Sequence, residues 1–155
     1  MTSKIESEKK VRILIVDDEP DIRFVLSKGL QAEGFSVDSS GDPEQVVETF
    51  KAGMYDLLLL DIKMPKMTGF ELFREIRKVD QKVRVCFITA FEIYFDEFKR
   101  VFPKIHVSCF IRKPVTVKQL AEAVRTELGR PELQEELEAA RQVHPGKSEN
   151  AFGPR

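Results

Sequence analysis

The sequence predicts an α/β fold in which a doubly wound, parallel sheet of five strands is covered by helices on both faces. Short apolar runs of strand length alternate along the chain with longer stretches of helical periodicity, a pattern typical of strand–helix–strand units. The run over residues 57–60 is apolar at every position, as expected for a strand buried on both faces. Charged or hydroxyl side chains follow four of the runs, and strand ends are where open sheets of this kind bind ligands.

The length of 155 residues is typical of one folded domain. We expect a polar tail over residues 1–10, the folded domain over 11–129, and an acidic helical extension with a disordered tail over 130–155. The last segment surrounds Leu133 and Leu137 with glutamates and then becomes polar, with Gly and Pro. It is too short for a second folded domain.

The charges of the chain nearly cancel, with 25 Lys and Arg against 26 Asp and Glu. Without a strong positive field, we expect no direct binding of DNA. No apolar run reaches the roughly 20 residues that span a membrane, so we expect a cytoplasmic protein without membrane contact. Cys86 and Cys109 lie in apolar runs, and we expect both to be plain core residues that indicate no oxidising compartment.

The first elements are predicted from their end signals. Residues 11–16 form an apolar strand, and Pro20 suits the first turn of the helix that follows, because that turn leaves its N–H groups unpaired. Gly34 ends this helix, and residues 35–39 indicate a short second strand. This strand carries no candidate site residue, which favours an edge position and the flavodoxin-like strand order 2-1-3-4-5.

Capping patterns predict where three further helices begin. Asp42 has the position of an N-cap with a first-turn proline and Gln45 behind it, and Gly53 is expected to stop that helix. Two Thr residues are followed at the third position by Glu or Gln, which predicts reciprocal capping boxes. These pairs are Thr68 with Glu71 and Thr116 with Gln119. With strands over residues 83–88 and 107–111, the prediction is five strands and five helices.

The side chains at the strand ends define the candidate site. They are Asp17 and Asp18, Asp61, Thr89, and Lys113. If the strands are parallel neighbours, three carboxylates, a hydroxyl and an ammonium converge at one edge of the sheet. Two like charges about 4 Å apart repel by roughly 4 kcal/mol at an effective dielectric of 20, so the cluster needs a cation. Lys113 supplies one positive charge and Mg²⁺ would supply two more, which makes this edge a candidate magnesium site.

Four stretches of the sequence carry a family resemblance. In order and spacing, ILIVDDEPDIR, DLLLLDIKMPKMTGFEL, CFITAF and CFIRKP resemble the motifs of response-regulator receiver domains of two-component signalling. The resemblance runs from about residue 11 to residue 128. It implies that Asp61 is the phosphoacceptor and that Asp17, Asp18, Asp61 and the main-chain carbonyl of Lys63 bind Mg²⁺.

The same resemblance implies roles for the last two strands. Lys113 would pair with the phosphoryl oxygens, and the bond to Pro114 would be cis, a conformation almost confined to X-Pro bonds. Thr89 would hydrogen-bond the phosphoryl group and, with Phe110, would form the switch. Alternatives stay open at three points. Phe110 is otherwise an ordinary strand aromatic, the acidic pair otherwise caps a helix, and Asp61 is otherwise a solvated strand-end acid.

The function that the resemblance implies is phosphorylation-dependent signalling. A histidine kinase or histidine phosphotransfer protein would phosphorylate Asp61, and the product would change its binding to a downstream protein. The chain would catalyse only its own phosphorylation and dephosphorylation, so we do not expect an enzyme. The alternative is a receiver-like scaffold that binds partners without phosphorylation, against which the complete residue set argues. A haloacid-dehalogenase-type phosphohydrolase would need a second acid where this chain has Lys63.

The segment between Thr89 and Lys113 departs from the family pattern. It is slightly longer than usual, lacks the customary Gly-Ala before the last strand, and carries five aromatic residues at near-helical spacing. They are Phe91, Tyr94, Phe95, Phe98 and Phe102. Because this stripe is either core or an aromatic binding face, the output partner, the cognate kinase and the oligomeric state are left open.

Overall fold

The structure, a computed structural model, describes residues 9–90, 96, 100 and 109–130. Its strands are β1 (Arg12–Val16), β2 (Ser36–Ser40), β3 (Leu57–Asp61), β4 (Arg84–Thr89) and β5 (Phe110–Arg112). Its helices are α2 (Pro20–Ala32), α3 (Pro43–Thr49), α4 (Gly69–Val79) and α6 (Val117–Leu128). The predicted aromatic helix within residues 91–106 and the extension over residues 131–155 lie outside the described residues.

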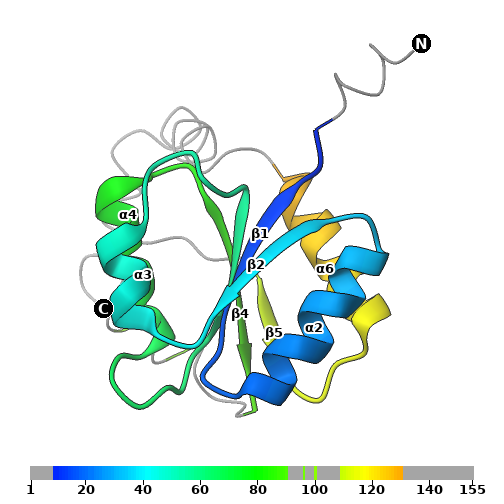
Figure 1. Cartoon of the computed structure of the whole chain (residues 1–155), viewed down its shortest axis with the longest axis horizontal. Coiled ribbons are helices and arrows are strands. Elements are labelled where there is room, and N and C mark those ends of the chain that lie inside the picture. The colour runs from blue at the N-terminus through cyan, green and yellow to red at the C-terminus, as the bar shows by residue number, and fades with distance from the viewer. Residues whose placement is uncertain (1–8, 91–95, 97–99, 101–108, 131–155) are drawn as a thin grey trace, which may run out of the picture.

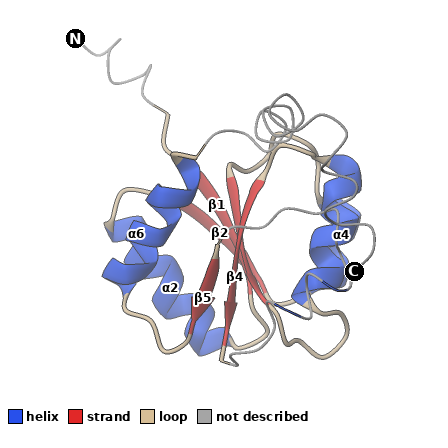
Figure 2. Ribbon diagram, turned by 180° about the vertical axis from the view of Figure 1, so that it is seen from behind, coloured by secondary structure: helices blue, strands red, loops and turns tan. Residues whose placement is uncertain are grey.

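The strands form one parallel sheet in the order β2-β1-β3-β4-β5, which confirms the predicted topology. Helices α3 and α4 cover one face of this sheet, and α2 and α6 cover the other (Figure 1, Figure 2). Strand β2 lies at one edge and carries mostly exposed side chains, as expected for the strand without site residues. No helix within the described ranges is long and apolar enough to cross a membrane.

Strand β3 joins the two halves of the hydrophobic core. Leu58 and Leu60 pack into the core under α3 and α4, whereas Leu57 and Leu59 pack into the core under α2 and α6. All four side chains are completely buried, because successive residues of a strand point to opposite faces of the sheet. The strand that ends in Asp61 is therefore anchored in both cores.

The helix starts follow the predicted caps. The Asp42 side chain accepts hydrogen bonds from the backbone N–H groups of the first turn of α3, and both predicted capping boxes are formed at α4 and α6. The predicted end of α3 is wrong. The helix ends at Thr49, because Phe50 adopts extended backbone angles and its side chain is buried in the core. Gly53, with φ of 83°, lies in the turn beyond it.

The first turn of α4 is in direct contact with the backbone of β3. Gly69 donates a hydrogen bond of 2.8 Å to the carbonyl oxygen of Ile62. A Cβ atom built on Gly69 would overlap the carbonyl oxygen of Asp61. This position therefore requires glycine for space, because the overlapping group is backbone and cannot rotate away.

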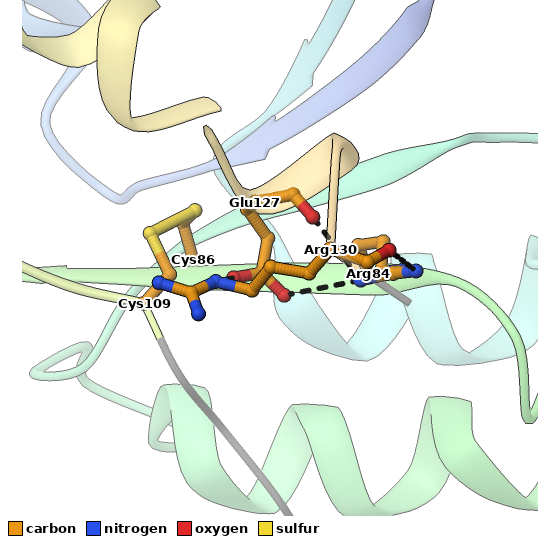
Figure 3. The surroundings of a disulfide bond; sticks show 5 residues. All are labelled: Arg84, Cys86, Cys109, Glu127 and Arg130. Atoms are coloured by element: carbon orange, nitrogen blue, oxygen red, sulfur yellow. Dashed lines mark hydrogen bonds and ion pairs between the residues drawn. A yellow bond between two sulfur atoms is a disulfide. The ribbon is translucent and has the colours of Figure 1, made fainter. Parts of the chain in front are cut away.

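A disulfide joins β4 to the residue before β5. Because Phe87 pairs with Phe110 in the sheet register, Cys86 lies beside Cys109, with 4.6 Å between their Cα atoms. Their sulfur atoms are bonded (Figure 3). Both residues are buried in the core under α6, as predicted. The expectation that they are free thiols is wrong, because they form a disulfide.

An ion-pair network surrounds the disulfide at the start of β4 (Figure 3). The Arg84 guanidinium donates to the carbonyl oxygens of Glu127, at 3.1 Å, and of Arg130, at 2.6 Å. The Glu127 carboxylate also lies 3.7 Å from Arg84 Nη1 and 3.3 Å from Arg130 Nε. These contacts fix the C-terminal end of α6 on β4, where a helix leaves carbonyl groups unpaired.

Replacing Gly69 tests the close approach of α4 to β3. We expect Gly69→Ala to lower the free energy of unfolding by about 2 kcal/mol or more, because the added methyl group overpacks against backbone. Gly129→Ala is the matched control, since its Cβ would meet nothing nearer than 3.5 Å and its φ of −84° suits alanine. Urea denaturation of both variants measures the difference. Equal stabilities of the two variants would contradict the steric argument.

Candidate functional site

The C-terminal ends of four strands bring the predicted site residues together. Asp17 and Asp18 follow β1, Asp61 ends β3, Thr89 ends β4 and Lys113 follows β5. Each of the three acids offers a carboxylate oxygen, and these oxygens all lie within 4.8 Å of one another. Asp17 is completely buried, Asp61 is 5% exposed and Asp18 is partly exposed. The parallel sheet thus produces the convergence that the sequence predicts.

Lys113 places its ammonium group among these acids. Its Nζ atom lies 3.2 Å from Asp17 Oδ2 and 3.8 Å from Asp61 Oδ2. Its backbone N–H donates to the carbonyl oxygen of Thr89 at 2.7 Å, which extends the pairing of β4 and β5 to the site. The peptide bond to Pro114 is cis, as the resemblance implied. Lys113 therefore offsets part of the negative charge of the cluster.

Burial dominates the electrostatics of Asp61. The pKa of Asp61 is raised from 3.8 to about 6, chiefly by loss of hydration and next by the negative charge of Asp17. Opposing contributions come from Lys113 and from the backbone N–H of Lys63, which donates to the carboxylate and lowers the pKa. Asp61 is therefore mostly ionised at neutral pH, but in an unfavourable environment.

The loop after β1 is held by residues that sequence reasoning missed. Arg23 Nη1 donates to the carbonyl oxygen of Asp17 at 2.6 Å, and the backbone N–H of Glu19 donates to Asp17 Oδ1 at 2.9 Å. The Glu19 carboxylate also lies 3.7 Å from Lys113 Nζ. No local sequence signal distinguishes Arg23 from a solvent-exposed helical arginine, because its partner is a main-chain atom six residues earlier.

The predicted switch residues lie on the neighbouring strands β4 and β5. Thr89 is buried, with 5% of its surface exposed, at the end of β4. Phe110 is half-buried on the opposite face of the sheet from the disulfide, and its ring stacks on Phe87 with 5.4 Å between centroids. Their arrangement is compatible with a switch, but rotation of Phe110 stays a prediction.

The donor set of the acidic cluster fits a hard divalent cation. Three carboxylates offer oxygen ligands, and one of the acids remains partly exposed to solvent. Mg²⁺ binds through one or two carboxylates while keeping several waters, whereas softer metals prefer thiolate or imidazole ligands. The cluster contains neither His nor Cys. These residues could therefore hold a metal ion of the magnesium type.

A largely apolar groove adjoins the site. Its volume is about 530 Å³, and it lies between α2 and residues 113–115, with Ile88 and Ala90 also lining it. The apolar surface continues along α2, where Phe24 and Val25 are 63% and 57% exposed. Large apolar side chains exposed side by side next to a polar site are typical of a protein contact surface.

Fold and site together define a receiver-type domain, with an acidic cluster and a lysine at the C-terminal edge of a sheet in the order 2-1-3-4-5. Comparison with protein families agrees. Residues 13–125 match the family described as the response regulator receiver domain, and the chain belongs to this family.

The chain is also similar to individual proteins of this family. The transcriptional regulatory protein RprY of Bacteroides fragilis is 32% identical over 116 residues, which cover 75% of this chain and 48% of RprY. The response regulator TrrA of Thermotoga maritima, in complex with Mg²⁺ and BeF, is 35% identical with a TM-score of 0.65, covering 75% of this chain and 97% of TrrA. TrrA in complex with the histidine kinase ThkA matches with 35% identity and a TM-score of 0.65, covering 77% of this chain and 99% of TrrA. The chain spans about half the length of the curated relatives it matches.

The raised pKa of Asp61 predicts how the metal-free protein responds to pH. Because the folded pKa of about 6 exceeds the unfolded value of 3.8, ionised Asp61 destabilises the fold at high pH, and this penalty disappears as pH falls through 6 towards 4. We expect Asp61→Asn to raise the free energy of unfolding by about 2 kcal/mol at pH 8 without metal. The gain should fade near pH 4.

Denaturation midpoints in the presence of a chelator measure this effect. Glu48→Gln, which removes one exposed charge on α3, is the control and should change stability little at either pH. A wild type that is as stable as Asp61→Asn at pH 8 would show that Asp61 carries no such penalty.

Proposed function

We propose that the chain accepts a phosphoryl group on Asp61 from a phosphorylated histidine, with Mg²⁺ bound, and that phosphorylation changes its binding to a downstream protein. The observation that carries the proposal is the position of Lys113. Its ammonium contacts both Asp17 and Asp61, at 3.2 and 3.8 Å, within a cluster of three acids. A lysine in an ordinary structural salt bridge needs only one carboxylate partner. Transfer of a phosphoryl group instead needs a nucleophile, a cationic side chain and a metal ion at the same place.

The chemistry of the proposed transfer follows from the charges present. An ionised Asp61 oxygen attacks phosphorus, the bond from phosphorus to the histidine nitrogen breaks, and an acyl phosphate forms. Lys113 can pair with the oxygens of the transferred group because its ammonium lies 3.8 Å from the attacking carboxylate. Thr89 would hydrogen-bond the product from the end of β4. Mg²⁺ on Asp17, Asp18, Asp61 and the Lys63 carbonyl would neutralise charge on the phosphoryl oxygens.

A protein partner is proposed for the groove beside Lys113. The TrrA relative forms a complex with the histidine kinase ThkA. In this chain, the apolar groove lined by Val25 and Lys113 adjoins the acidic cluster, and it offers a surface for a docking histidine donor. We therefore propose that a sensor kinase or a histidine phosphotransfer protein donates the phosphoryl group. We also propose that the chain acts in the cytoplasm, with a folded unit over residues 11–129. It would catalyse only its own phosphorylation and dephosphorylation.

Phosphorylation by a small donor tests the proposed function. Incubation of the full chain with acetyl phosphate and Mg²⁺ is expected to add one base-labile phosphoryl group, which intact mass spectrometry detects. Asp61→Asn removes the nucleophile and should stay unlabelled, whereas Glu48→Gln should be labelled as the wild type is. Absence of labelling in the wild type would favour the alternative of a scaffold that acts without phosphorylation.

Metal affinity provides a separate test of the acidic cluster. Mg²⁺ relieves the repulsion among the three acids, so we expect binding on the order of millimolar or tighter without phosphate. Asp18→Ala should weaken this affinity by about tenfold or more, because a coordinating charge is lost. Calorimetric titration measures the effect, with Glu48→Gln as control. Unchanged affinity in Asp18→Ala would place the metal elsewhere.

A further inference from the structure

The disulfide between Cys86 and Cys109 links the two strands that carry the predicted switch. Cys86 lies on β4, three residues before Thr89, and Cys109 directly precedes β5. The backbone reinforces the link, since the N–H of Phe87 donates to the carbonyl oxygen of Cys109 at 2.9 Å. Cys109 is four residues before Lys113, so the cross-link lies about 13 Å from Lys113 along the strand direction.

Strand β5 is held by a short ladder and by the packing of its own side chains, with Ile111 buried in the core under α2 and α6. It is three residues long and ends the order β2-β1-β3-β4-β5, so among the described strands it pairs with β4 alone. Three register pairs hold it, from Phe110 to Arg112. Short edge strands open locally at a lower free energy than central ones. A covalent bond at the start of β5 therefore restrains the segment that leads to Lys113.

The sulfur atoms lie in the core under α6, with charged side chains nearby (Figure 3). Near the disulfide, the guanidinium groups of Arg84 and Arg130 both pair with the carboxylate of Glu127, and the three groups together carry one net positive charge (Figure 3). Positive charge stabilises a thiolate, the nucleophile in disulfide exchange. Cys109 is 7% exposed and Cys86 is completely buried, so Cys109 is the sulfur that a small reagent reaches first.

We propose that Cys86 and Cys109 form a reversible redox switch that sets the position of β5, and with it Lys113, relative to Asp61. The proposal rests on the proposed function, which places the chain in the cytoplasm and makes Lys113 part of the phosphorylation site. Cytoplasmic thiols are kept reduced, and the disulfides that form there are mostly transient and redox-sensing. The reduced and oxidised chains are then two states of one regulated domain.

The oxidant is a small-molecule disulfide such as oxidised glutathione. The Cys109 thiolate attacks one sulfur of the reagent, which forms a mixed disulfide and releases one small thiol. The Cys86 thiolate then attacks Cys109 Sγ and releases the second small thiol. Two protein thiols are oxidised, one small disulfide is reduced to two thiols, and excess small thiol reverses both steps.

Oxidation is expected to favour phosphorylation. The cross-link holds β5 in register with β4, which keeps Lys113 in contact with Asp61. Without it, β5 is held only by its ladder and by side-chain packing, and Lys113 is less well positioned. Because misplacement of a catalytic group lowers the rate steeply, the oxidised chain should be phosphorylated faster by about threefold or more.

The experiment compares the full-length wild type in both redox states, so that no variant is needed to obtain the reduced form. One sample is equilibrated with reduced glutathione and the other with oxidised glutathione, and alkylation of free thiols verifies each state. The initial rate of labelling by acetyl phosphate with Mg²⁺ is then measured by intact mass. Hydrogen exchange of the amides over Phe110–Arg112 reports the position of β5 independently.

The proposal expects faster labelling and slower amide exchange in the oxidised wild type. The control is Cys109→Ala, whose rate should equal that of the reduced wild type in both buffers. Equal or slower labelling of the oxidised wild type would overturn the proposal while leaving Asp61 as phosphoacceptor. Persistence of free thiols in oxidised glutathione, or an equal response in Cys109→Ala, would also overturn it. Absence of labelling in both states would overturn the proposed function, and this proposal with it.

Discussion

Repulsion among three carboxylates is the interaction to which the rest of the site responds. Oxygens of Asp17, Asp18 and Asp61 lie within 4.8 Å of one another, where each pair of like charges costs several kcal/mol at the dielectric of a protein surface. The acids stay together because the backbone behind them is fixed. Strands β1 and β3 are central neighbours in the sheet, and apart from the exposed Arg12 their side chains are completely or almost completely buried. Lys113 offsets part of the remaining charge, and the rest makes the pocket receptive to a cation.

Much of this arrangement could be predicted because its signals are local. Apolar runs mark the strands, and the capping boxes at Thr68 and Thr116 mark helix starts within four residues of sequence. Parallel strands all present their C-terminal ends at one edge, so the meeting of Asp61 with Lys113 follows once the strand order is right. The absence of candidate site residues in the second strand was enough to place it at the edge, where the structure has it.

The features that could not be predicted depend on contacts between distant segments. The disulfide depends on the register of β4 against β5, and a shift of one residue would have put Cys86 and Cys109 on opposite faces. Arg23 donates a hydrogen bond to the main-chain carbonyl of Asp17. Because every residue has such a carbonyl, the pattern of side chains in the sequence does not reveal this partner. The early end of α3 arises because burial of Phe50 takes precedence over the glycine stop signal.

The glycine at the start of α4 has a mechanical consequence. Between most helices and strands lies a layer of side chains, which absorbs small displacements by changing rotamers. At Gly69 that layer is missing, and the helix backbone lies directly against the carbonyl group of Asp61. A movement of this carbonyl group would therefore displace the first turn of α4 directly. The end of β3 and the start of α4 therefore meet through backbone atoms, in addition to the packing of Leu72 and Phe73 on the sheet.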